Sequence, residues 1–166
     1  MSSLAEQVRH LGSFLPGNLL RGLAHSLTGI PIPAGTRLAP GARLDRGCRL
    51  GAGCRIGRSA SLAGDVRLGD RCIVGEEARL NHLEAGEGTH LEAGVFCMGA
   101  RPGRIVIGRH AYIGVRALLD FSSDVILGDH VHIAGPSTAL HTHSSVAMAL
   151  TGVPADGPDG RTYGPI

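Results

Sequence analysis

The chain has 166 residues, a formal charge of +2, only 3% aromatic residues and no tryptophan. Every basic residue is arginine, and the small net charge does not favour a nucleic-acid partner. A basic strip along one face, which would suit a phosphorylated ligand, remains an alternative. No run of about 18 apolar residues is present, which excludes a membrane-spanning helix. Glu6, Arg9 and His10 stand where a signal peptide needs apolar residues, so we expect a cytoplasmic protein.

Residues 1–29 predict two short helices. Ser3 with Glu6 matches a capping box, and leucines and a valine follow at helical spacing until Pro16. A second stripe of leucines follows before Gly29. We expect an N-terminal helical cap over the open end of the domain behind it. The alternative is a helix on a membrane surface, but its polar face lacks a dense cationic strip.

From residue 32 onward an aliphatic residue returns at every sixth position. These residues are Ile32, Leu38, Leu44, Leu50, Ile56, Leu62, Leu68, Val74 and Leu80. A small or β-branched residue lies four positions after each of the first eight: Thr36, Ala42, Cys48, Cys54, Ala60, Val66, Cys72 and Ala78. Helices repeat apolar residues at three and four positions and half-buried strands at two, so this period predicts short straight segments joined by tight corners. We expect an all-β solenoid with aliphatic columns inside it, and glycines that relax the corner backbone at Gly51, Gly57, Gly69 and Gly75.

The pattern continues to residue 143 with two irregularities. Residues 97–106 contain Gly and Pro and predict an extruded loop. The period resumes at Ile107 and, after a slip of two residues, again at Leu127. A slip makes a coil bulge, so its surroundings are a candidate functional region. The four cysteines form no CxxC pair, and three occupy the small inward positions, so we expect reduced, buried thiols at Cys48, Cys54, Cys72 and Cys97.

A period of six in which Leu, Ile or Val is followed by Gly and a small residue resembles the hexapeptide-repeat family. The resemblance covers about residues 30–143 and implies a left-handed parallel β-helix. Most known members are acyltransferases, so acyl transfer is also implied, although the same coil serves other roles.

The segment that begins at Ile107 looks like a narrower group, the maltose/galactoside and polysaccharide O-acetyltransferases. The matching pieces are Leu119-Asp120, Leu127-Gly128-Asp129, Ile133-Ala134-Gly135-Pro136 and His141-Thr142-His143. In that group the last histidine of the turn is usually catalytic, which implies His143. His141 stays an alternative, because this turn is one residue shorter than the common form. Asp120 is implied to orient the histidine or to bind the acceptor; its alternative is a solvated corner carboxylate.

Acyl transfer suits these residue types. Neutral imidazole can take the proton of an attacking hydroxyl at physiological pH, and a thioester already carries a good leaving group. The resemblance implies acetyl-CoA as co-substrate, a sugar or glycan acceptor, no metal, and a homotrimer with active sites between subunits. The outward template positions of His110, His130 and His132 predict solvated or intersubunit histidines.

Residues 144–166 predict a loop followed by the start of a further coil, which the sequence cuts short at Tyr163–Ile166. In the resembled family the coils beyond this loop form the acyl-CoA groove, and we assign no coenzyme A-binding residue. One alternative function is therefore a non-catalytic β-helix that acts as an assembly module. Another is a γ-type carbonic anhydrase with zinc on three histidines, but that needs two histidines five positions apart, and the late ones stand at 130, 132, 141 and 143.

Overall fold

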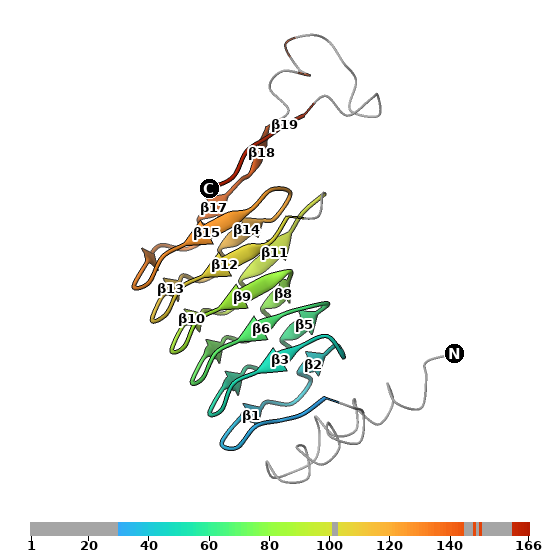
Figure 1. Ribbon diagram of the computed structural model, residues 1–166, viewed down its shortest axis with the longest axis vertical. Coiled ribbons are helices and arrows are strands. Elements are labelled where there is room, and N and C mark those ends of the chain that lie inside the picture. The colour runs from blue at the N-terminus through green and yellow to red at the C-terminus, as the bar shows by residue number, and fades with distance from the viewer. Residues whose placement is uncertain (1–29, 101–102, 145–147, 149, 151–160) are drawn as a thin grey trace, which may run out of the picture.

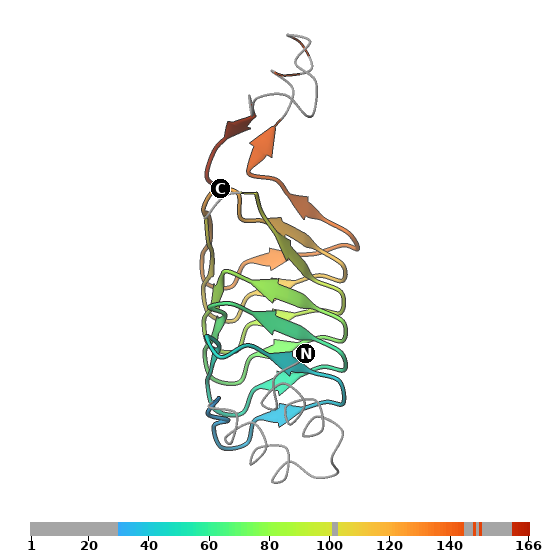
Figure 2. The same cartoon turned by 90° about the vertical axis from the view of Figure 1, so that its right-hand side faces the viewer.

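The computed structural model describes residues 30–100, 103–144, 148, 150 and 161–166. The predicted helical cap, residues 1–29, lies outside the described residues. The described chain winds into a parallel β-helix whose three sheets form the three sides of a prism (Figures 1 and 2). The prediction of an all-β solenoid is therefore confirmed.

Each turn of the helix adds one short strand to each sheet. The first sheet contains β1 (Arg37–Leu38), β4 (Arg55–Ile56), β7 (Ile73–Val74), β10 (His90–Leu91), β13 (Tyr112–Ile113) and β16 (His132–Ile133). The second contains β2 (Arg43–Leu44), β5 (Ser61–Ala63), β8 (Arg79–Asn81), β11 (Phe96–Met98), β14 (Leu118–Asp120) and β17 (Ala139–Leu140). The third contains β3 (Arg49–Leu50), β6 (Arg67–Leu68), β9 (Leu83–Ala85), β12 (Ile105–Ile107) and β15 (Val125–Leu127). All pairings within these sheets are parallel.

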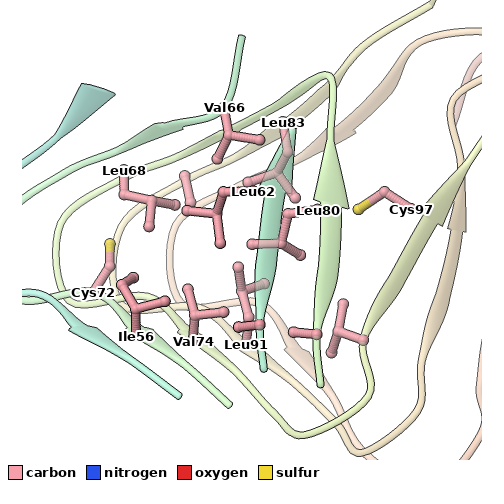
Figure 3. Close-up of a cluster of buried hydrophobic side chains, with 14 of the residues drawn as sticks. Ile56, Leu62, Val66, Leu68, Cys72, Val74, Leu80, Leu83, Leu91 and Cys97 are labelled. Carbon is pink, nitrogen blue, oxygen red and sulfur yellow. The ribbon is translucent and has the colours of Figure 1, made fainter. Parts of the chain in front are cut away.

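The six-residue period builds the core. Leu38 pairs with Ile56, so three periods make one turn and each aliphatic residue lies on one of the turn before. The aliphatic residues from Leu38 to Leu80 are all buried, and Ile32 is partly buried against them. The small residues four positions later are buried as well. Figure 3 shows these side chains gathered between the three sheets. All four cysteines are free and buried, as predicted.

The predicted role of the glycines is wrong. Gly51 and Gly57 have no left-handed backbone; a Cβ added to Gly57 would lie 2.5 Å from the carbonyl carbon of Gly75 on the next turn. These glycines let successive turns approach closely. The left-handed residue comes two positions later, directly before the small inward residue, and it is a non-glycine at Ser59 (φ 55°) and Arg71 (φ 55°).

Later turns depart from three regular periods, and the extra residues lie at corners. Ala85 pairs with Ile107, which lies four positions beyond three periods, and Ile107 pairs with Leu127, which lies two positions beyond them. The predicted loop 97–106 is too long at both ends, because β11 and β12 take in its flanks and leave 99–104 between them.

The described residues of this loop lie against the bulge at 121–124. Ala100 N donates to Ser122 Oγ at 2.8 Å, Gly99 and Gly103 pack on Phe121, and Arg104 N donates to Asp124 Oδ1 at 3.1 Å.

The last described residues return to the solenoid. The strand β18 (His143–Ser144) pairs antiparallel with β19 (Thr162–Tyr163). Beyond β19, Ile166 N donates to Asp124 O at 3.0 Å and Ile126 N donates to Ile166 O at 2.6 Å. Ile166 therefore lies beside β15, where the third sheet would receive its next strand.

Candidate functional site

Asp120 and His143 meet where β14 ends and β18 begins. His143 Nδ1 lies 2.5 Å from Asp120 Oδ2, although the two residues are 23 positions apart in the chain. The Asp120 side chain is 1% exposed and the His143 side chain 24% exposed. Asp120 is therefore not the solvated corner carboxylate of the alternative interpretation. The pair combines a fully enclosed carboxylate with an imidazole that still reaches solvent.

The surroundings of Asp120 stabilise its ionised form. Burial by itself raises the pKa of this carboxyl, but hydrogen bonds from Ser122, His143 and Thr142 outweigh burial and hold the pKa below its ordinary value. Ser122 N donates to Oδ1 at 2.9 Å and Thr142 N donates to Oδ2 at 3.0 Å. An ionised carboxylate only accepts hydrogen bonds, so His143 Nδ1 must be the donor in the contact. In neutral His143, the lone pair that can accept a proton is then on Nε2.

Thr142 and Ser122 are site residues that sequence reasoning missed. Thr142 Oγ1 donates to the main-chain oxygen of Asp120 at 3.0 Å and accepts from Ser123 N at 3.0 Å. Both Thr142 and Ser122 are buried. Together they join the histidine turn to the bulge at 121–124 and restrict the orientation of the carboxylate. The two-residue slip pointed to this region, but not to these hydrogen bonds.

His141 lies beside His143 but outside the carboxylate network. Its ring centroid is 6.3 Å from that of His143, with the planes nearly perpendicular, and the residue is exposed. The Tyr163 ring on β19 lies 6.0 Å from His143 on the antiparallel strand pair. The structure thus brings Asp120 and His143 into contact and leaves His141 in solvent beside them.

The other histidines singled out in the sequence lie on the outside of the solenoid. His110 and His130 stack with their ring centroids 5.4 Å apart, and His132 packs edge-on against Tyr112. All three are exposed. Across the part of the chain that the structure describes, no three His, Cys, Asp or Glu side chains are grouped to hold a metal ion. Within the same residues no helix is long and apolar enough to cross a membrane.

Comparison with known families agrees with the geometry of the solenoid. Residues 47–82 match the family model described as bacterial transferase hexapeptide (six repeats). A search of curated proteins finds no match. The matched repeats and the parallel β-solenoid support a relationship to the hexapeptide-repeat, left-handed β-helix family. Because that family consists mostly of acyltransferases, the match supports a transferase function in general terms.

Proposed function

We propose that the protein is an O-acyltransferase that moves an acetyl group from acetyl-CoA to a hydroxyl of a sugar or glycan. The observation that carries this proposal is the contact between His143 Nδ1 and the buried Asp120 carboxylate. It supplies an oriented imidazole whose second nitrogen is free to act as a base, on a fold that supports transferase chemistry.

In the proposed reaction His143 Nε2 takes the proton of the acceptor hydroxyl while its oxygen attacks the thioester carbonyl carbon. The carbon–sulfur bond then breaks, the acetyl group stays on the acceptor oxygen, and the proton passes from His143 to the departing sulfur. The products are the acetyl ester and coenzyme A thiol. Asp120 stabilises the imidazolium that forms between these steps and keeps Nδ1 protonated throughout.

Thiol release tests the assignment. Wild-type protein is incubated with acetyl-CoA and a panel of sugars, glycans and nucleotide sugars, and free coenzyme A is measured. With an acceptor that supports turnover, we expect His143→Gln to lower kcat by about 100-fold or more, because it removes the base. His141→Gln is the matched control from the same turn and should leave kcat nearly unchanged, because His141 lies outside the carboxylate network.

Two results would contradict the proposal. Loss of activity in His141→Gln with activity kept in His143→Gln would move the base to His141. No turnover in wild-type protein, with no coenzyme A binding by calorimetry, would favour the non-catalytic assembly module.

We further propose a homotrimer with active sites between subunits, as is typical of the fold. A monomer by light scattering at micromolar concentration would contradict this oligomeric state.

A further inference from the structure

A notch interrupts the corner between the first and second sheets. Gly94 N donates to Glu76 O at 2.8 Å and Arg116 N donates to Ala93 O at 2.8 Å, so the corners of three successive turns stack directly. This stacking puts Glu77, Gly94 and Arg116 in one column, all with left-handed backbone. Since neighbouring strands lie about 4.8 Å apart, Glu77 and Arg116 stand about 10 Å apart with a residue that has no side chain between them.

The second sheet supplies the other wall of this notch. The strands β8 and β11 lie side by side in the second sheet (Figure 1). Arg79 on β8 pairs in register with Phe96 on β11, and both residues are exposed. Phe96 is 38% exposed, so its ring offers an apolar surface to a ligand. The resulting cavity has a volume of about 240 Å³ and is lined by Glu77, Arg79, Gly94, Phe96 and Arg116.

The charges in the notch have no partner among the described residues. Arg71 and Arg109 occupy comparable corner regions and pair with Glu87 and Asp129 on the next turn. Among those same described residues, Arg79 and Arg116 form no ion pair and no side-chain hydrogen bond. Two guanidinium groups beside one carboxylate leave the cavity with a net positive charge. A bound anion would offset that charge, and guanidinium groups bind carboxylate and phosphate oxygens well.

We propose that this notch is a binding site for a small organic anion that carries a single ring and a hydroxyl or amino group opposite its charge. The anionic group lies between Arg79 and Arg116, the ring packs on Phe96, and the donor group faces Glu77. The cavity is smaller than the roughly 300–1,000 Å³ that holds drug-sized ligands, so it fits one ring. The site is independent of acyl transfer, because no residue of the Asp120–His143 network lines it.

Calorimetry with 4-hydroxybenzoate tests the proposal. This probe carries the charge, the ring and the hydroxyl group; phenol lacks the charge and acetate lacks the ring. We expect 4-hydroxybenzoate to bind with a Kd of about 1 mM or tighter, and phenol and acetate to bind at least about tenfold more weakly. Undetectable binding of 4-hydroxybenzoate, or equally tight binding of acetate, would overturn the proposal.

Gly94→Asn is the critical variant, because asparagine tolerates left-handed backbone and would fill the notch. Gly53→Asn is its matched control: Gly53 has φ 70° against 69° for Gly94, but it lies outside the notch. Only Gly94→Asn should abolish binding; equal effects of the two variants would refute the site. Arg116→Gln leaves the glycine backbone intact and should weaken binding about tenfold through loss of a charge-assisted hydrogen bond. Unchanged affinity in Arg116→Gln would also refute it.

Discussion

Replacing Asp120 by asparagine removes one charge and one acceptor atom from the centre of the site. In the wild-type protein Oδ2 accepts from Thr142 N and His143 Nδ1, and Oδ1 accepts from Ser122 N. An asparagine side chain has one oxygen and one NH₂ group, so its NH₂ group must face at least one of these donors. The best orientation keeps the oxygen toward Thr142 and His143 and leaves the buried Ser122 N–H without its acceptor.

The cost follows from these contacts. A buried donor left unsatisfied costs about 1–3 kcal/mol, and the two bonds that remain change from charge-assisted to neutral, with a loss of about 1 kcal/mol in total. We therefore expect Asp120→Asn to lower the free energy of unfolding by about 2–4 kcal/mol. The amide oxygen still accepts from His143 Nδ1 but carries no charge to stabilise the imidazolium, so in the proposed transferase kcat should fall with little change in KM.

Denaturant unfolding at neutral pH measures the change in stability, with Asp124→Asn as the matched control. Asp124 lies four residues away, is only half-buried and accepts one side-chain hydrogen bond, from Arg104 N at 3.1 Å. Asp124→Asn should lower the free energy of unfolding by less than about 1 kcal/mol. If the two variants are destabilised equally, the carboxylate network around Asp120 is not the stabilising feature described here.

The stability difference between wild type and Asp120→Asn should also depend on pH. The pKa of Asp120 in the folded protein lies below that of an aspartate in an unfolded chain, which is about 3.9. Its contribution is therefore complete above about pH 4 and is lost as the pH falls toward the folded pKa. The difference should stay constant between about pH 5 and pH 8 and shrink below about pH 4. A difference that instead shrank near neutral pH would refute this assignment.

Two further predictions concern the solenoid itself and are checked by denaturant unfolding. Gly57→Ala should lower the free energy of unfolding by about 1–3 kcal/mol, because the added Cβ would clash with Gly75. Gly128 lies at the same template position, but a Cβ added there would have no atom within 4 Å, so Gly128→Ala should change the free energy of unfolding by less than about 0.5 kcal/mol. Equal effects would contradict the close-approach role of the glycine. Leu62→Ala should lower the free energy of unfolding by about 2–5 kcal/mol, because Leu62 is 1% exposed. Ile126→Ala should lower it far less, because Ile126 is 60% exposed. A small loss of stability in Leu62→Ala would contradict the place of Leu62 in the core.

The sequence predicts the interior of this protein well because the interior is periodic. The sequence alone shows an aliphatic residue at every sixth position and a small residue four positions later. Recognising this pattern does not require knowing which turns of the solenoid are in contact. The glycines after Leu50 and Ile56 show the limit of this reading. Their pattern is visible in the sequence, but the reason for it, backbone of the next turn within 2.6 Å of an added Cβ, depends on contacts with residues three periods further along the chain.

The candidate site is less predictable because it lies where turns depart from three regular periods. Asp120 and His143 were identified as candidate site residues through a family resemblance, and the sequence did not indicate that Asp120 is buried. Its burial depends on Ser122 and Thr142, which come from a bulge and from a later turn of the solenoid. The notch at Gly94 was missed for a different reason: Glu77, Gly94 and Arg116 occupy the corner position directly before the inward residue in successive turns, and the sequence pattern did not show that these positions stack.

The uneven turn lengths have a consequence for how such a chain can diversify. An extra residue within a two-residue strand would exchange its inward and outward side chains, whereas an extra residue at a corner lengthens only that corner. Insertions and deletions are therefore tolerated along the three edges of the prism and rejected on its sides. Here two longer corners, the described residues of 99–104 and residues 121–124, lie together on one edge next to His143. Changes in the length of these two corners could alter the acceptor that reaches the histidine while the aliphatic columns beneath them stay the same.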